Sequence, residues 1–202
     1  MDASFRKAGR REWLGLAVVA LPCMLYSMDL TVLDLALPTL ARDLAPTSAQ
    51  LLWIVDSYGF LLAGSLVTMG MLGDRFGRRR LLWLGALAFG AASALAAFST
   101  SAAMLIVARG LLGVAGATFA PSTLGLIRNL FDDGRERTFA VGIWTTSYSV
   151  GAGLGPLAGG VVLERFWWGS AFLIGAPIVA LVLLLGPWLL PESRAEQSTP
   201  ID

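Results

Sequence analysis

The chain has 202 residues, of which 56% are hydrophobic and 14% are charged, and its formal net charge is +1. Its mean hydropathy of +0.70 exceeds what an ordinary soluble core requires, which indicates an integral membrane protein in contact with the lipid bilayer. The near-neutral charge gives no support for a nucleic-acid partner, and the single Cys23 excludes a disulfide within the chain. Because the sequence has no histidine, we expect no metal site, and carboxylates are the groups expected to exchange protons near neutral pH.

Six apolar stretches are long enough to cross a bilayer as helices, so the predicted fold class is all-α integral membrane with six transmembrane helices. The first is interpreted as a retained span because it carries Asp29 and Asp34 and lacks a small-residue cleavage site. A basic tail (1–12) and a polar tail (191–202) flank the bundle. The predicted spans are residues 13–37, 51–72, 81–98, 102–127, 139–163 and 171–190.

The distribution of Lys and Arg predicts the orientation of the bundle. Twelve of these residues fall in the two tails and in the connections after the second and fourth spans. Only Arg42 and Arg165 fall on the opposite side, and Arg109 lies inside the fourth span. The positive-inside rule therefore places both termini in the cytoplasm.

Charged residues within the spans are the candidate functional groups, since a charge in hydrocarbon costs about 3 kcal/mol or more. At 1.5 Å per residue, Asp29 lies in the outer third of the membrane, and Asp56 and Arg109 reach a similar depth from the outer edge. We therefore expect that these three groups could meet at one level. Asp34 lies roughly 140° around the helix from Asp29 and is expected at the outer rim.

Three aromatic residues of the spans have ring faces that could stack on a bound ligand: Tyr26, Tyr58 and Trp144. Ordinary packing is the competing interpretation for all three. A purely structural buried pair is likewise the alternative for Asp29 with Arg109.

The connection after the second span, residues 70–80, reads G-M-L-G-D-R-F-G-R-R-R. Gly77 permits a tight reversal, and the three arginines hold it at an anionic cytoplasmic surface. Anchoring is the simpler interpretation for Arg78, Arg79 and Arg80 taken singly. The candidate functional residues of this connection are Gly70, Asp74, Arg75, Gly77 and Arg78.

The fifth span contains glycines with regular spacing, G-x8-G-x3-G-P-x2-G-G. In lipid, small residues let another helix approach closely. Gly151, Gly155 and Gly159 line one face, and we expect that face to be covered by a second subunit or by sequence outside this chain. The whole motif comprises Gly142, Gly151, Gly155, Pro156, Gly159 and Gly160.

Together these motifs resemble those of the drug:proton antiporters of the major facilitator superfamily, in particular fourteen-spanner exporters of quaternary ammonium compounds and methyl viologen. The resemblance also includes residues 29–38 (D-L-T-V-L-D-L-A-L-P), residues 53–58 and the fourth-span motif around Arg109. The fourth-span motif departs from the family pattern, because Leu112 replaces the usual glutamine and Ala115 with Gly116 exchanges the usual small residues.

The resemblance implies the N-terminal six-helix half of a transporter in the cell (inner) membrane. That transporter would export lipophilic cations in exchange for protons, with the proton gradient as energy source and no cofactor. Asp29 would bind proton and cation, Arg109 would orient and tune it, and Asp56 would offer a second negative charge near the outer mouth. Asp74 would help close the cytoplasmic side against the other half.

The length leaves three interpretations open: an N-terminal piece of a longer transporter, a truncated product, or a half-transporter that pairs with itself or with a separate half. The alternative function is a truncated, non-transporting protein that associates with another transporter half. A uniporter or symporter is less favoured because of the glycine signature. An enzyme is not expected, since no Ser-His, metal or paired catalytic carboxylate constellation is present.

Overall fold

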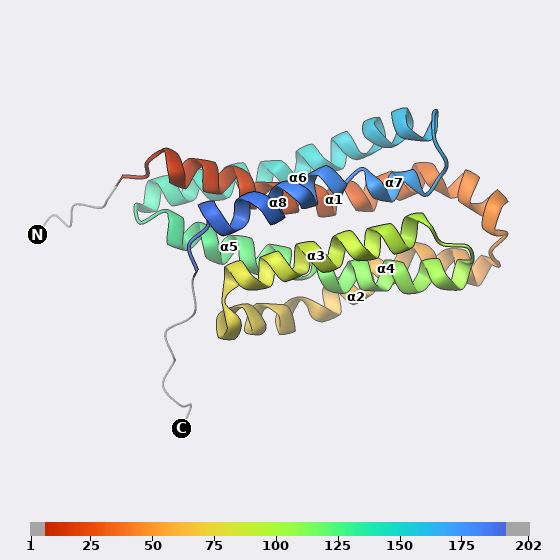
Figure 1. Ribbon diagram of the computed structural model, residues 1–202, viewed down its shortest axis with the longest axis horizontal. Helices are drawn as coiled ribbons and strands as arrows, with labels where there is room; N and C mark the ends of the chain where they lie inside the picture. The colour runs from red at the N-terminus through yellow and green to blue at the C-terminus, as the bar shows by residue number, and fades with distance from the viewer. Residues whose placement is uncertain (1–6, 193–202) are drawn as a thin grey trace, which may run out of the picture.

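The computed structural model describes residues 7–192, and within this range the chain is helical with no strand. Its helices lie side by side along one axis (Figure 1). The start of α1 and the end of α8 lie at the same end of the bundle (Figure 1). The outer parts of the two predicted tails, residues 1–6 and 193–202, lie outside the described residues.

The helices alternate in direction along the bundle, so that each connection lies at one of its two ends (Figure 1). Two crossings are made by pairs of shorter helices, α4 with α5 and α7 with α8. The helices of the described chain are α1 (Arg10–Leu44), α2 (Ser48–Phe76), α3 (Arg78–Ala97), α4 (Ala102–Gly116), α5 (Phe119–Leu130), α6 (Gly134–Leu163), α7 (Ser170–Leu173) and α8 (Ala176–Leu189).

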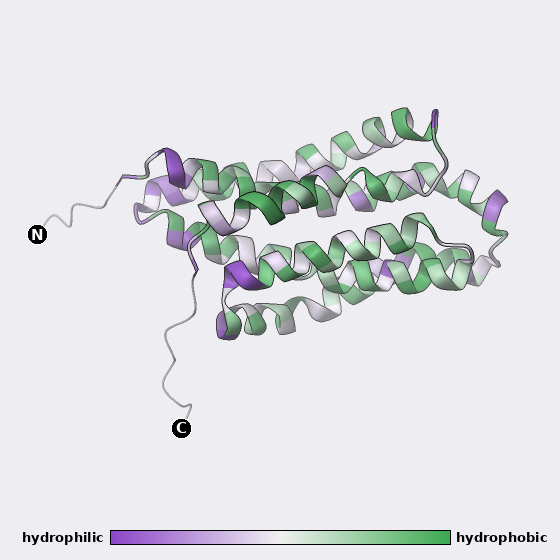
Figure 2. Ribbon diagram, in the orientation of Figure 1, coloured by the Kyte–Doolittle hydropathy of each residue, from purple (hydrophilic) through white to green (hydrophobic). Residues whose placement is uncertain are grey.

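Five stretches of the described chain are long and apolar enough to cross a membrane. They correspond to α1, α2, α3, α4 with α5, and α7 with α8. The remaining helix, α6, has 30 residues and is also long enough, but its many glycine, serine and threonine residues lower its hydropathy. Hydrophobic residues predominate along the middle of the helices and hydrophilic ones gather near their ends (Figure 2).

The fourth and sixth crossings are each interrupted, whereas their apolar stretches predict continuous helices. A proline explains where each interruption lies, because proline lacks the N–H that would bond the carbonyl four residues earlier. Pro121 follows the break at Ala117, and Pro177 follows the end of α7 at Leu173. Pro22, Pro38, Pro156 and Pro187 lie inside helices that continue past them.

Helix caps fix several of the connections between crossings. Thr47 and Gln50 form a reciprocal capping box at the start of α2. Asp133 caps α6, because its Oδ1 accepts from the backbone N–H of Arg135 at 2.7 Å and of Glu136 at 3.1 Å. These two bonds favour the ionised carboxylate, so they lower the pKa of Asp133.

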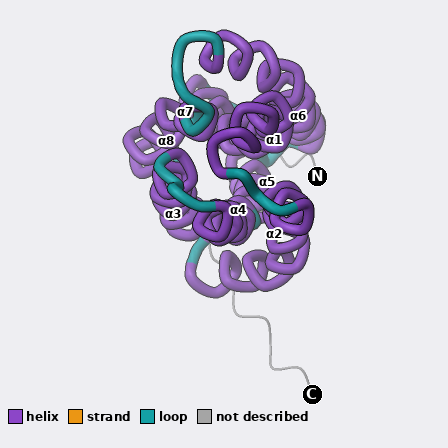
Figure 3. The backbone as a smooth tube through the Cα atoms, turned by 90° about the vertical axis from the view of Figure 1, so that its right-hand side faces the viewer, coloured by secondary structure: helices purple, strands orange, loops and turns teal. Residues whose placement is uncertain are grey.

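Helices α1 and α6 lie side by side (Figure 3), and their contact is the most extensive between any two helices of the described chain. Gly151, Gly155 and Gly159 are buried in this contact. A side chain at Gly155 would meet the backbone of Met28, and one at Gly159 would meet Val32 at 2.5 Å. The expectation that this glycine face is covered by a second subunit or by sequence outside the chain is therefore wrong, since α1 covers it.

The opposite face of α6 and most of α2 lie on the outside of the bundle. Only 17% of the most apolar window of α2 is buried. Gly142 and Gly153 on α6 face open space. These two helices therefore carry the largest unpartnered surfaces in the described chain.

Candidate functional site

A buried ion pair joins α1 to α4. Nη1 of Arg109 donates to Oδ2 of Asp29 at 2.6 Å. Asp29 is 6% exposed and Arg109 is 1% exposed, so both charges are removed from the surface of the chain. A buried charge needs such a partner, because desolvation of an unpaired ion costs several kcal/mol.

Arg109 has two further partners, both on α2. Its Nε donates to the backbone carbonyl of Ile54 at 3.1 Å. Its guanidinium carbon lies 4.5 Å from the centre of the Tyr58 ring, a cation–π distance. The guanidinium is therefore held by α2 as well as by the carboxylate, and its position does not depend on Asp29 alone.

Close helix contact brings these groups together. Gly113, one turn after Arg109 on α4, lies against α2, and a side chain there would meet the backbone at Tyr58 and Leu62. The Tyr58 hydroxyl donates to the carbonyl of Tyr26 on α1 at 3.5 Å. The small residues of α4 thus let three helices converge on the ion pair.

Asp29 also lines a small cavity of about 10 Å³ between α1, α3 and α7. This volume is close to that of a single water-sized probe. Phe89 and Phe172 form part of its apolar wall. In this conformation the carboxylate adjoins a water-sized space rather than a cavity large enough for an organic cation.

Asp56 does not join the ion pair, contrary to the expectation that the three groups could meet at one level. The buried face of α2 carries Ile54, Ser57 and Tyr58, and Asp56 lies about 200° around the helix from Ile54. Asp56 is half-buried, and within residues 7–192 it forms no ion pair or side-chain hydrogen bond. Asp34 is exposed, on a different face of α1 from Asp29, as its spacing predicts.

The three aromatic candidates have different surroundings. Tyr58 is fully buried and its ring faces Arg109, so it offers no free surface in this structure. Trp144 is half-buried, and its Nε1 donates to the Thr123 hydroxyl at 3.0 Å. Tyr26 pairs with Tyr148 of α6, with ring centres 5.3 Å apart.

Sequence reasoning missed Tyr148. Its backbone carbonyl accepts a 2.7 Å bond from the hydroxyl of Ser27, which lies two residues before Asp29. The position of Tyr148 within the glycine-rich span was a usable signal, because a polar aromatic side chain is uncommon among small and aliphatic residues. Its ring contacts Tyr26, whose backbone carbonyl accepts from the Tyr58 hydroxyl.

The loop between α2 and α3 also forms specific contacts. Asp74 pairs with Arg78, and Nη1 of Arg78 donates to the carbonyl of Pro121 at 2.7 Å. Gly77 has a φ of 107°, a conformation that favours glycine. Gly70 lies near Pro121, and Arg75 is exposed with its guanidinium carbon 5.5 Å from the Phe76 ring centre.

Glu192, just after α8, is a further residue that sequence reasoning missed. Its carboxylate lies against Gly77 and is 3.5 Å from Nε of both Arg79 and Arg80. The end of the sixth crossing is therefore tied to the start of the third by ionic contacts.

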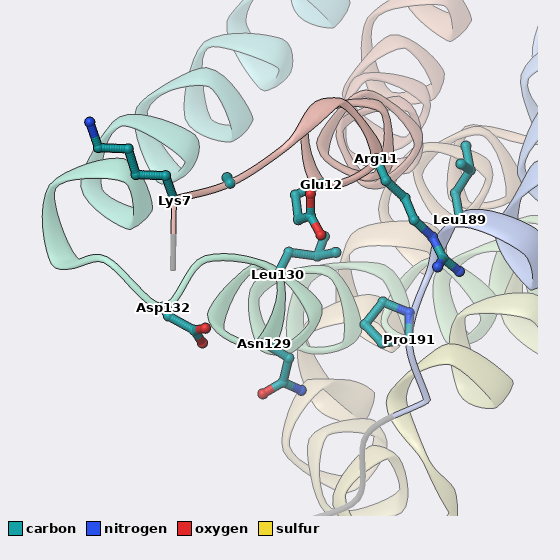
Figure 4. Close-up of a pocket in the computed structure, with 9 residues that line it drawn as sticks. Lys7, Arg11, Glu12, Asn129, Leu130, Asp132, Leu189 and Pro191 are labelled. Carbon is teal, nitrogen blue, oxygen red and sulfur yellow. The ribbon is translucent and has the colours of Figure 1, made fainter. Parts of the chain in front are cut away.

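Several larger pockets lie away from the ion pair. One, of about 220 Å³, lies at the end of the bundle where the described chain begins and ends, and Figure 4 shows that its lining mixes charged, polar and apolar residues. Another, of about 650 Å³, is apolar and lies between α1 and the outward side of α6, with Met24, Phe139 and Val150 in its wall. Neither of these two includes Asp29 or Arg109.

Helical crossings around a buried carboxylate–guanidinium pair define a multi-pass α-helical membrane protein. The family model of the Major Facilitator Superfamily matches residues 19–202. The chain therefore belongs to this superfamily of membrane transporters, which are not enzymes.

Two relatives are an efflux pump and a resistance protein. The multidrug efflux pump LfrA of Mycolicibacterium smegmatis is 52% identical over 95% of this chain, and the methyl viologen resistance protein SmvA of Salmonella typhimurium is 43% identical over the same share. The matched regions cover 38% and 39% of those proteins. The chain is thus a homologue of drug efflux transporters and spans about two fifths of their length.

The fold also matches a solved structure. A bacterial homologue of the human lysosomal transporter Spinster, in an inward-facing and unoccupied conformation, superposes with a TM-score of 0.76. The match covers 96% of this chain and 46% of that one at 19% sequence identity. This likeness shows the six-crossing half of the superfamily fold.

Proposed function

We propose that the chain is the N-terminal half of a proton-coupled exporter of lipophilic or quaternary ammonium cations. The observation that carries the proposal is the buried Asp29–Arg109 pair, in a chain similar to a multidrug efflux pump and a methyl viologen resistance protein. An ionisable group inside a membrane bundle is by default a candidate for ion or proton handling.

The geometry supports a proton-exchange role for Asp29. Arg109 stays charged, so the carboxylate is the member of the pair that can gain and lose a proton. When Asp29 is neutral, Arg109 retains the Ile54 carbonyl and the Tyr58 ring, so protonation leaves the cation with partners. Proton and cationic substrate would then compete for one carboxylate as access alternates between the two sides.

The working orientation follows from charge. The start of α1, the α2–α3 loop, the α5–α6 loop and the end of α8 lie together at one end of the bundle (Figure 1), and this is the end with most of the basic residues. We place that end in the cytoplasm and the bundle in the cell (inner) membrane. Asp56 would lie nearer the outer mouth as a second negative charge, and Asp74 with Arg78 would take part in closing the cytoplasmic side.

Uptake into energised inverted membrane vesicles that contain the chain together with the other transporter half tests the proposal, because an exporter moves its substrate into the lumen of such vesicles. A fluorescent cation is followed before and after collapse of the pH gradient. Asp29→Asn is expected to abolish the gradient-dependent component, whereas Asp43→Asn, an exposed carboxylate on the same helix, retains it. Unchanged uptake in Asp29→Asn would exclude the assigned role.

A second candidate is a non-transporting membrane protein that associates with another transporter half. The broad exposed faces of α2 and α6 favour an association of this kind. The same vesicles discriminate the two functions. A non-transporting associated protein would cross-link to a second polypeptide but would show no gradient-dependent uptake.

A further inference from the structure

A groove of about 330 Å³ lies between the first turns of α3 and the last turn of α8. It is at the end of the bundle where α3 begins and α8 ends (Figure 1). Its lining combines two cations, an indole and apolar side chains: Arg79, Arg80, Trp83, Leu84 and Pro187. The groove is separate from the ion pair that carries the proposed transport.

Hydrogen bonds between the two helices fix the shape of the groove. Pro187 has no N–H, so it cannot bond the carbonyl of Leu183 within α8. The indole N–H of Trp83 donates to that carbonyl at 3.2 Å instead. Nη1 of Arg79 donates to the carbonyl of Leu190 at 3.1 Å. Trp83 and Arg79 are therefore held in place before any ligand arrives.

Among residues 7–192, the positive charge of the groove is only partly compensated. Arg79 and Arg80 share the single carboxylate of Glu192, whereas the neighbouring Arg78 is paired with Asp74. The Arg80 side chain is 62% exposed, and within residues 7–192 its terminal amino groups form no hydrogen bond. Both terminal nitrogen atoms of Arg80 are thus available at the rim to donate hydrogen bonds to a phosphate.

An apolar surface continues from the groove toward the middle of the bundle. Leu84 and Leu87 on α3 are exposed, as are Leu184 (67%) and Trp188 (79%) on α8. In a membrane protein such a strip faces acyl chains, and Trp side chains at its end sit at the level of the headgroups. The positive charge therefore lies at the level of a phospholipid headgroup, and the apolar strip lies at the level of its acyl chains.

We propose that this groove binds one anionic phospholipid, with its phosphate at Arg80 and its acyl chains along Leu84 and Leu184. Basic pockets between transmembrane helices are a known means of holding anionic headgroups. The lipid would bridge α3 and α8 beside Glu192, at the end of the sixth crossing. This site requires only that the bundle is in a membrane and is independent of what the protein transports.

Native mass spectrometry of the detergent-solubilised chain tests the site. Phosphatidylglycerol or phosphatidylcholine is titrated, and singly bound lipid is quantified. We expect the anionic lipid to bind more tightly, and Arg80→Gln to weaken its binding about fivefold, as about 1 kcal/mol per arginine at a membrane surface gives. Arg80→Lys keeps the charge and should retain most of the preference.

Arg165→Gln is the matched control, because Arg165 is an exposed arginine at the opposite end of the bundle. It should bind phosphatidylglycerol as the unmodified chain does. Equal binding of the two lipids, or unchanged binding in Arg80→Gln with its melting temperature preserved, would overturn the proposal. Displacement of the lipid by excess inorganic phosphate would show a site for the free anion and would also overturn it.

Discussion

The ion pair of Asp29 and Arg109 shows how one side chain depends on several helices. Within the described part of the chain the carboxylate has a single charged partner, while the guanidinium also bonds the Ile54 carbonyl and faces the Tyr58 ring. Removing one member of a buried pair leaves the other charge desolvated, whereas replacing both by apolar groups removes the cost. Substituting one member of the pair is therefore expected to reduce stability more than substituting both.

Arg109→Met should destabilise the protein by about 3 to 5 kcal/mol, because Asp29 then lacks its counter-ion. The double variant Asp29→Leu with Arg109→Met should recover most of that loss. Thermal unfolding in detergent, followed by circular dichroism, measures both. A double variant as unstable as the single one would contradict a compensated pair and would locate the effect in the contacts of Arg109 with α2.

At the scale of helices, the contact of α1 with α6 depends on the absence of side chains at three positions. Gly155→Leu should destabilise the chain by about 1 to 3 kcal/mol, since the new side chain would meet Thr31 and the backbone of Met28. Gly153→Leu, two residues away on the open side of α6, is the control and should change stability little. The melting temperatures of the two variants are compared in one detergent. An equal decrease in melting temperature for both variants would rule out close α1–α6 packing.

The cap of α6 predicts a pH dependence at low pH. The pKa of Asp133 is lowered in the folded chain by the N–H groups of Glu136 and Arg135, so its stabilising contribution is complete above the usual value of 3.8. The contribution is lost as the pH falls through the lowered folded pKa. The wild-type chain should therefore lose more stability between about pH 6 and pH 3 than Asp133→Asn, whose side chain does not titrate in this range. Melting temperatures at the two pH values provide the comparison, and equal losses would contradict it.

For the whole molecule, the orientation of the bundle is the main prediction that remains to be tested. In a Cys23→Ala background, a cysteine at Thr100 in the α3–α4 connection should react with an impermeant maleimide in intact cells. A cysteine at Asp132 in the α5–α6 connection should react only after permeabilisation. The reverse pattern would place the basic end outside and would require a different direction for the proposed transport.

The amino-acid sequence was sufficient to predict the class of protein, the six crossings and the three charged groups from which the ion pair is drawn. Apolar stretches of bilayer length, the spacing of small residues and the rarity of charge in hydrocarbon are local properties, and each can be evaluated without knowing the fold. The depths of Asp29 and Arg109 follow from the rise per residue, which made their meeting predictable.

Only the tertiary structure decided which helix faces meet. Asp56 lies on a face of α2 that is turned away from the ion pair, although its expected depth is similar. The ring of Tyr58 packs against the Arg109 guanidinium, and the glycine face of α6 packs on α1 within the chain. Glu192 reaches Gly77 and the arginines from the far end of the sequence. Depth is set by position along one helix, but rotation and pairing are set by the close packing of all the helices at once, which no single span encodes.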